Sequence, residues 1–190
     1  DGGTITLNGG TYKAPVRTHP VLGQSNGGTL SLYGTTVAVA ETAVAGQCIG
    51  NDGATLKIYE GTIIDNGPVG DHDAVADGTV EMNGGTIRSN KSAAVRAKNS
   101  TDNFQLNGGT IENSKYGVEV RDNNPDVTIG NVTFRNNTTD IYLGAGQKLQ
   151  TMVRREVCLR ILLLQILTTQ SAMKMGICTY THTSITGSTR

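Results

Sequence analysis

Residues 79–87 read TVEMNGGTI, and variants of this nine-residue phrase occur six times in the chain. The six copies are TITLNGGTY from Thr4, TLSLYGTTV from Thr29, TLKIYEGTI from Thr55, TVEMNGGTI from Thr79, NFQLNGGTI from Asn103 and DVTIGNVTF from Asp126. Successive copies begin 25, 26, 24, 24 and 23 residues apart. A fixed period in this range is typical of a solenoid, in which each unit buries its apolar face only against its neighbours.

One repeat has the pattern of three short strands separated by corners. Val80 and Met82 alternate with polar residues, as in a half-buried strand, and the NGG triplet then turns the chain. Ile87 begins a second strand, and the apolar Val95 belongs to a third. Three strands and three corners within 24 residues predict one coil of a parallel β-helix. The sequence therefore predicts an all-β solenoid of about six coils of 23–26 residues.

Stacked coils place equivalent residues in columns about 4.8 Å apart. Three columns are predicted to fill the interior: Ile5, Leu30, Leu56, Val80, Phe104 and Val127; Leu7, Leu32, Ile58, Met82, Leu106 and Ile129; Tyr12, Val37, Ile63, Ile87, Ile111 and Phe134. A fourth column consists of threonines: Thr11, Thr36, Thr62, Thr86, Thr110 and Thr133. At the corners we expect positive φ at Gly9, Gly34, Gly84 and Gly108, and a ladder of Asn66, Asn90, Ser114 and Asn137. On the outside, we expect Arg88, Glu112 and Arg135 to stack with alternating charge.

Composition argues against a globular domain anchored by aromatic residues and against a partner that is recognised by charge alone. The chain has 25 Gly and 15 Asn, residues that form turns, whereas aromatic residues are only 4% and Trp is absent. Its net charge is zero, so electrostatics predict neither a nucleic acid nor an anionic membrane as partner. Because the chain opens inside a repeat, we expect a piece of a longer protein.

Composition changes abruptly near residue 149. All Asn, Asp and Pro residues lie within residues 1–148, the predicted repeat domain, and residues 149–190 form a tail without any of them. Apolar residues within 153–170 follow a helical spacing, in a stretch too short and too rich in Arg for a membrane span. Two interpretations compete: an amphipathic helix that caps the last coil, or a disordered or out-of-frame segment.

This repeat resembles those of the right-handed parallel β-helix proteins, the pectate-lyase-like superfold. Within it, residues 1–148 are most similar to the NGGTI-type repeats of bacterial surface and secreted proteins. The superfold hosts lyases, hydrolases, tailspikes and inert stalks, so the resemblance implies a fold but no single activity.

The catalytic motifs of the related hydrolases are largely missing. That branch carries Asn-x-Asp, Asp-Asp, Gly-His-Gly and Arg-x-Lys motifs on neighbouring coils, and only Arg96-Ala97-Lys98 matches here. The acidic cluster Asp71-His72-Asp73 lies in an inserted corner, where loops carry function on rigid scaffolds. Its alternative interpretation is a solvated turn, because Asp is a common turn residue. Asp71, Asp73, Arg96 and Lys98 are thus the candidate catalytic residues, should the chain be an enzyme.

Binding residues are suggested at two other corners. Asp122 and Asp126 flank an oxygen-rich corner that suits Ca²⁺, the only cofactor that the residues suggest, although Asn-Pro also simply initiates a turn. Tyr33 and Tyr59 occupy equivalent positions on adjacent coils and, with His72, are candidate ligand-binding residues. Two stacked rings suit a sugar, or alternatively cover a corner.

The leading functional hypothesis is a non-catalytic stalk or adhesive module of a bacterial surface or secreted protein. Its expected location is extracellular or on the bacterial cell surface, and its expected partner is a polysaccharide or host glycan. The alternatives are a polysaccharide lyase or glycoside hydrolase, and a phage tailspike-like module.

Overall fold

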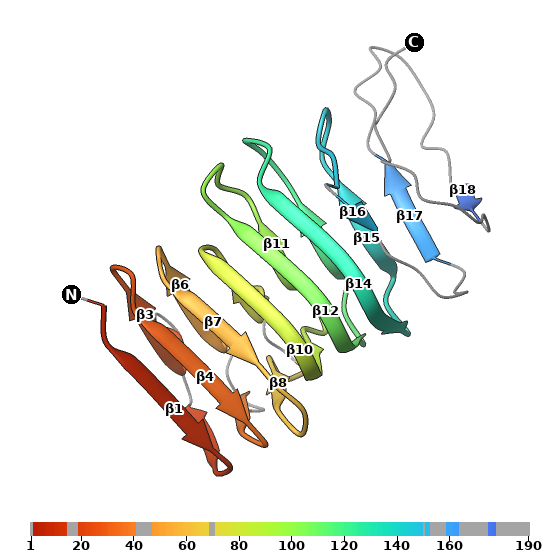
Figure 1. Cartoon of the computed structure of the whole chain (residues 1–190). Helices are drawn as coiled ribbons and strands as arrows, with labels where there is room; N and C mark the ends of the chain where they lie inside the picture. Colours follow the sequence, from red (N-terminus) through yellow and green to blue (C-terminus); the bar gives the residue numbers. More distant parts are fainter. Residues whose placement is uncertain are drawn as a thin grey trace.

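The computed structural model describes residues 2–14, 19–40, 47–68 and 71–149, together with the backbone of three later strands. Every helix or strand in these parts is a β-strand, and the strands stack as successive coils (Figure 1). The six repeats lie in sequence order along one axis, and the solenoid that they form has about five turns. The predicted all-β parallel β-helix is therefore confirmed.

The first face of the solenoid contains the strands that begin each repeat. These are β1 (Thr4–Asn8), β4 (Thr29–Tyr33), β7 (Thr55–Ile58), β10 (Thr79–Arg88), β12 (Asn103–Glu112) and β14 (Asp126–Arg135), followed by β16 (Thr151–Met152). All neighbours are parallel, and the repeat starts are register partners, as Thr4 is of Thr29. The register therefore follows the repeat that is visible in the sequence.

Two further faces complete each coil. The second face contains β2 (Thr11–Ala14), β5 (Thr36–Val39), β8 (Ile63–Asp65) and the later halves of β10, β12 and β14. The third face contains β3 (Leu22–Ser25), β6 (Ile49–Asp52), β9 (Val75–Ala76), β11 (Ala93–Ala97), β13 (Tyr116–Val120), β15 (Thr139–Leu143), β17 (Leu159–Leu163) and β18 (Met175–Ile177). All pairs on these faces are parallel except β17 with β18.

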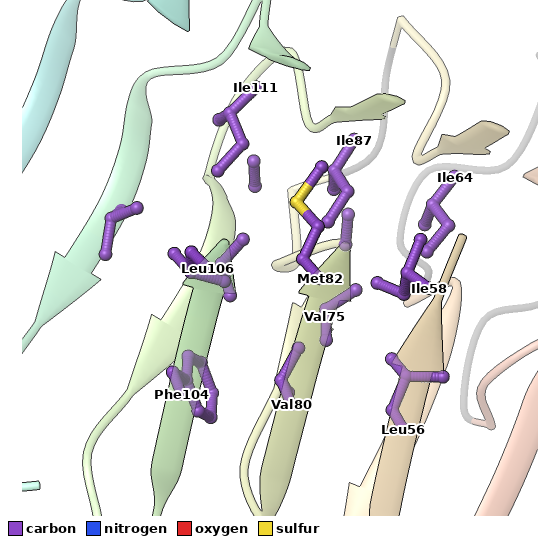
Figure 2. Close-up of a cluster of buried hydrophobic side chains, with 14 of the residues drawn as sticks. Leu56, Ile58, Ile64, Val75, Val80, Met82, Ile87, Phe104, Leu106 and Ile111 are labelled. Carbon is purple, nitrogen blue, oxygen red and sulfur yellow. The ribbon is translucent and has the colours of Figure 1, made fainter. Parts of the chain in front are cut away.

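The interior is filled by aliphatic columns, as predicted. Leu56, Val80 and Phe104 are register partners and fully buried, and Ile58, Met82 and Leu106 form the next column (Figure 2). Ile5 of the first coil is 59% exposed, whereas its partner Leu30 is 5% exposed. Burial of a side chain thus requires a coil on both sides.

The third predicted column was wrong at one residue. Ile64, not Ile63, lies between Val37 and Ile87, and Ile63 instead interrupts the threonine column. Four residues lie between Ile58 and Ile63, whereas three lie between the equivalent residues Met82 and Thr86. This extra residue in the corner shifts the following strand by one position, which exchanges its two sides.

The threonine before Ile63 points inward, as the equivalent Thr35 does in the coil without the extra residue. Thr62 is buried, and its hydroxyl donates a hydrogen bond to the Leu32 carbonyl at 2.9 Å. Thr35 of the preceding coil does the same with the Leu7 carbonyl, at 3.1 Å. Buried hydroxyls therefore satisfy backbone carbonyls at this corner.

The corner glycines match the prediction in two coils only. Gly9 and Gly34 have positive φ, but in the NGGT repeats the second glycine takes this conformation, Gly85 with φ 80° and Gly109 with φ 99°. A Cβ on Gly109 would lie 2.6 Å from Met82 Cε and 2.7 Å from the Gly85 carbonyl oxygen. Conformation and space both require glycine at this position.

A buried polar ladder runs through the corner after the second face. Its members are Asn66, Ser89, Ser114 and Asn137. Ser89 replaces the predicted Asn90, which is exposed and donates to the Gly67 carbonyl at 2.7 Å. The Ser89 backbone N–H donates to Ser114 Oγ at 2.9 Å, and the Ser114 N–H donates to Asn137 Oδ1 at 3.1 Å. Side chains thus satisfy backbone groups where the chain leaves the sheet.

The tail departs from one prediction. Leu159–Leu163, within the stretch for which a helical cap and a disordered or out-of-frame segment were the alternatives, form strand β17 and pair in parallel with β15. The helix is therefore wrong for these residues, because the edge of β15 offers unpaired backbone groups that an apolar strand satisfies. The rest of 153–170 lies outside the described residues, and the domain boundary at 148 stays a prediction. No helix of the described part is long and apolar enough to cross a membrane.

Truncation of a central core residue will destabilise the solenoid far more than truncation at its first coil. We expect Leu106→Ala to lower the free energy of unfolding by about 2–5 kcal/mol, because it leaves a cavity between two coils. The matched control Ile5→Ala, at a 59% exposed position, will cost less than about 1 kcal/mol. Urea denaturation followed by circular dichroism measures both, and equal losses would contradict the burial described.

Positive-φ glycines from two different NGG corners will differ in their tolerance of alanine. Gly109→Ala places a methyl group against Met82 and the Gly85 carbonyl at positive φ, and we expect a loss of about 2–4 kcal/mol. Gly9 also has positive φ but no atom within 4 Å of its would-be Cβ, so Gly9→Ala will cost only about 1 kcal/mol. Thermal unfolding compares them; a tolerated Gly109→Ala would refute the close approach of the coils.

Candidate functional site

The third face carries a row of outward residues that differ from coil to coil. Ala76, Arg96, Glu119 and Tyr142 are successive register partners on β9, β11, β13 and β15. Strand pairing therefore brings Arg96 and Glu119 side by side, about 4.8 Å apart at the backbone. The rigid sheet beneath positions each side chain.

Asp73 joins this row from the inserted corner just before β9. Its carboxylate accepts hydrogen bonds from Ser92 Oγ at 2.7 Å and from the Ala93 backbone N–H at 3.1 Å. Arg96 Nη2 lies 2.5 Å from its other oxygen. The Asp73 side chain is 3% exposed, so it is a buried charge that is neutralised by an adjacent guanidinium.

Glu119 forms a second ion pair one coil further on. Its side chain is also 3% exposed, and Arg121 Nε donates to Glu119 Oε1 at 2.9 Å. This hydrogen bond, followed by the carboxylate charge, raises the pKa of Arg121 above its ordinary value. Arg121 is 53% exposed, so the acid lies beneath and the cation reaches solvent.

Two tyrosines complete the surface. The rings of Tyr116 and Tyr142 are 4.7 Å apart between centroids, at an interplanar angle of 36°. Lys115 Nζ lies 5.1 Å from the centre of the Tyr116 ring. Burial raises the pKa of the Tyr142 hydroxyl, which stays a neutral donor at physiological pH.

We call these six residues the third-face cluster: Asp73, Arg96, Tyr116, Glu119, Arg121 and Tyr142. At the surface they offer the Arg121 guanidinium as a donor and tyrosine hydroxyls that both donate and accept, whereas the two carboxylates are 3% exposed and paired with arginines. Ion pairs and strand positions hold these groups in place before any ligand arrives. Such an arrangement suits a ligand that carries many hydroxyl groups.

The structure brings two of the four predicted catalytic residues together, namely Asp73 and Arg96. Lys98 instead pairs with Asp77, at 3.3 Å, and Asp71 pairs with His72 Nδ1, at 2.7 Å. Both members of the latter pair are exposed, and the hydrogen bond with His72 lowers the pKa of Asp71. A lowered pKa does not suit a carboxylic acid that has to donate a proton near neutral pH.

Sequence reasoning missed Tyr116, Glu119, Arg121 and Tyr142. The signal was present in the spacing: Arg96 to Glu119 and Glu119 to Tyr142 are each 23 residues, close to the 24 and 23 residues that separate the last three repeat starts. The third strand of each coil lacks the NGGT phrase, and its alignment across coils rested on the apolar residues Val75, Val95, Val118 and Ile141 alone. Ala76, Arg96, Glu119 and Tyr142 directly follow these residues, so the same alignment places them in one row.

The predicted tyrosine pair exists at the first corner, which joins the first face to the second. The rings of Tyr33 and Tyr59 stack with centroids 4.1 Å apart and an interplanar angle of 4°. A side-chain hydrogen bond with Tyr59 raises the pKa of Tyr33. One face of each ring is thus occupied by the other ring, which leaves less ring surface for a ligand than two separate rings would offer.

The corner suggested for Ca²⁺ is a hydrogen-bonded turn. Asn123 and Asn124 have positive φ, and the Asn124 backbone N–H donates to Gln147 Oε1 at 3.0 Å. Among the described residues, no group of three or more His, Cys, Asp or Glu side chains gathers around Asp122 and Asp126 or elsewhere. Since Ca²⁺ takes about six to eight oxygen ligands, these two carboxylates form a sparse donor set.

Cys48 does not supply a nucleophile. It is fully buried, and its thiol lies 3.7 Å from Asn66 Oδ1. Burial raises the pKa of the thiol well above its ordinary value, which disfavours the reactive thiolate.

Comparison of the chain with protein-family models, with curated proteins and with solved structures found no match. The parallel β-helix therefore stands on the structure itself, and the likeness to NGGTI-type and pectate-lyase-like proteins stays a prediction from the repeat.

Loss of the Asp73 carboxylate will destabilise the third face. Asp73→Ala leaves Arg96 without its partner and the Ala93 N–H without its acceptor, and we expect a loss of about 2–4 kcal/mol. Lys98→Ala is the matched control, because Lys98 also forms an ion pair but is 41% exposed, so it will cost less than about 1 kcal/mol. Urea titrations decide between them; similar losses would mean that the Asp73 pair is no more than a surface contact.

Proposed function

We propose that this chain is a structural and adhesive module of an extracellular bacterial protein, on the cell surface or secreted, and that its third face binds carbohydrate. The β-helix supplies a rigid support, and a polysaccharide or host surface glycan is the partner. The observation that supports this proposal most is the third-face cluster, which holds fixed polar groups and two aromatic rings on neighbouring coils.

The chemistry of the cluster suits a sugar better than other partners. Sugar hydroxyls both donate and accept, as do Tyr116 and Tyr142, while the 53% exposed Arg121 donates. Tyrosine also offers an apolar ring surface to the C–H groups of a sugar ring. The buried acids are each neutralised by an arginine, so the surface is not a strong field of one sign.

A second candidate function is cleavage of a polysaccharide. Asp73 and Glu119 are two nearly buried carboxylates with Arg96 between their strands, and glycoside hydrolysis uses a pair of carboxylates. Both acids are engaged with arginines, whereas a general acid has to carry a proton, so binding without turnover is the preferred function.

A glycan and polysaccharide array with the full chain tests the proposal. We expect retention of one or a few glycans, weakened about tenfold by Tyr142→Ala because an aromatic contact is lost. Tyr33→Ala, in the stacked pair at the first corner, is the matched control and will leave binding unchanged. Soluble products are assayed in the same wells.

Three results would count against the preferred function. Binding that is lost with Tyr33→Ala but kept with Tyr142→Ala would move the site to the first corner. Product release that Glu119→Gln abolishes would make the chain an enzyme. An array without any retained glycan would leave a spacer between other parts of a longer protein.

A further inference from the structure

The second face carries a column of charged residues whose signs alternate. Asp65, Arg88, Glu112 and Arg135 are successive register partners on β8, β10, β12 and β14. Arg88 Nη1 lies 3.4 Å from Asp65 Oδ2, and Arg88 Nη2 lies 3.1 Å from Glu112 Oε1. We call this column the charge strip; it includes the predicted stack of Arg88, Glu112 and Arg135.

The charge strip lies beside an uncharged column. Its members on the same four coils are Ile63, Thr86, Thr110 and Thr133. Ile63 is among the few large apolar side chains that are exposed in the described residues, at 36%. The second face therefore carries one charged column and, beside it, one column of methyl and hydroxyl groups.

The order of charges makes the strip complementary to itself. Read along the chain, the signs are minus, plus, minus, plus. A two-fold axis that runs across the strip, between Arg88 and Glu112, reverses this order to plus, minus, plus, minus. Each charge of one copy then faces an opposite charge of the other, and each uncharged column faces its own copy.

We propose that a second copy of this chain packs on the second face, antiparallel to the first, around this two-fold axis. Asp65 then faces Arg135 of the other copy, and Arg88 faces Glu112, each twice by symmetry. Ile63 faces Thr133 of the other copy. The contact is isologous and closes as a dimer, so it does not propagate into fibres.

The last residue of the charge strip, Arg135, favours a second copy of the chain over a second face that stays exposed to solvent. Arg135 is exposed and makes no ion pair with any residue that the structure describes, although Arg88 has two carboxylate partners. The second copy supplies Arg135 with the Asp65 carboxylate, which is 30% exposed in its side chain. Lys13 and Ala38, earlier in the same column, do not oppose any of the four charges of the strip.

The size of the contact sets its strength. Four coils extend only about 19 Å along the axis, so the buried area falls below that of a standard stable interface. Intermolecular ion pairs between partly exposed side chains are each worth little and are screened by salt. The dimer is therefore a weak one that forms at low ionic strength and dissociates in high salt.

Sedimentation equilibrium of the full chain tests the proposal. We expect dimers at about 10 mM ionic strength, where the Debye length is about 30 Å, and monomers at about 1 M, where it is about 3 Å. Arg135→Glu and Asp65→Lys each create two like-charge contacts, so each variant alone will be monomeric. An equimolar mixture of the two restores opposite charges across the interface and will form dimers again.

A matched control and a fold check accompany these variants. Lys148→Glu changes the net charge as Arg135→Glu does, at an exposed position away from the charge strip, and will still dimerise. Circular dichroism reports whether Asp65→Lys folds, since Asp65 Oδ1 also accepts the Gly67 N–H at 2.9 Å. If it does not fold, Arg135→Glu alone still decides the matter.

The proposal is overturned by a native chain that stays monomeric at low ionic strength. It is equally overturned by an Arg135→Glu variant that dimerises like the native chain, which would place any contact on another face. Two folded variants that remain monomeric when mixed would show that the charges do not meet as described.

Discussion

Backbone hydrogen bonding between parallel strands in register determines nearly every other feature of this molecule. Each strand pairs with the equivalent strand of the next coil, so a residue lies above its counterpart about one repeat earlier in the chain. The core then consists of columns such as Leu56, Val80 and Phe104, in which apolar side chains stack on apolar side chains. A slip by one residue would turn every buried side chain of a strand to the opposite side. The repeat therefore has to be kept in the strands, and variation is confined to the corners.

The corners show how that register survives changes in length. The third coil has one residue more between Ile58 and Ile63 than the fourth coil has between Met82 and Thr86. Gly61 and Thr62 then repeat the positive φ of Gly34 and the inward hydroxyl of Thr35, so the next strand still pairs in parallel. At the following corner, the longer insertion contributes Asp73 to the third face. Insertions that the sheet tolerates are thus also the source of new surface chemistry.

The sequence predicted the fold well because its strongest signal, a repeated phrase of nine residues, is the same signal that sets the register of the first face. It predicted the interior less well at the third coil, where Ile64 rather than Ile63 lies in the buried column. A count of residues shows that this coil has one residue more, but it does not show on which side of the corner that residue lies. The candidate site was predicted only in part. Asp73 and Arg96 were found as unusual residues, but their neighbours Glu119 and Tyr142 lie on strands without a recognisable phrase. The strand at Leu159–Leu163 was missed because its apolar spacing also fits a helix, and only the free edge of β15 favours a strand.

Strand register has different consequences for the charged residues of the second face and for those of the third face. On the second face, charges of alternating sign form ion pairs with their neighbours in the same chain. Arg135, at the end of the column, is exposed and makes no such pair with a described residue, so it is available to a partner. On the third face, each acid is buried against an arginine from the same or the next coil. Buried carboxylates cost free energy unless they are paired, and a solenoid that needed only rigidity would be at least as stable with uncharged residues in these positions. The two pairs therefore hold Arg96 and Arg121 at fixed positions on the third face, whatever their net effect on the stability of the fold.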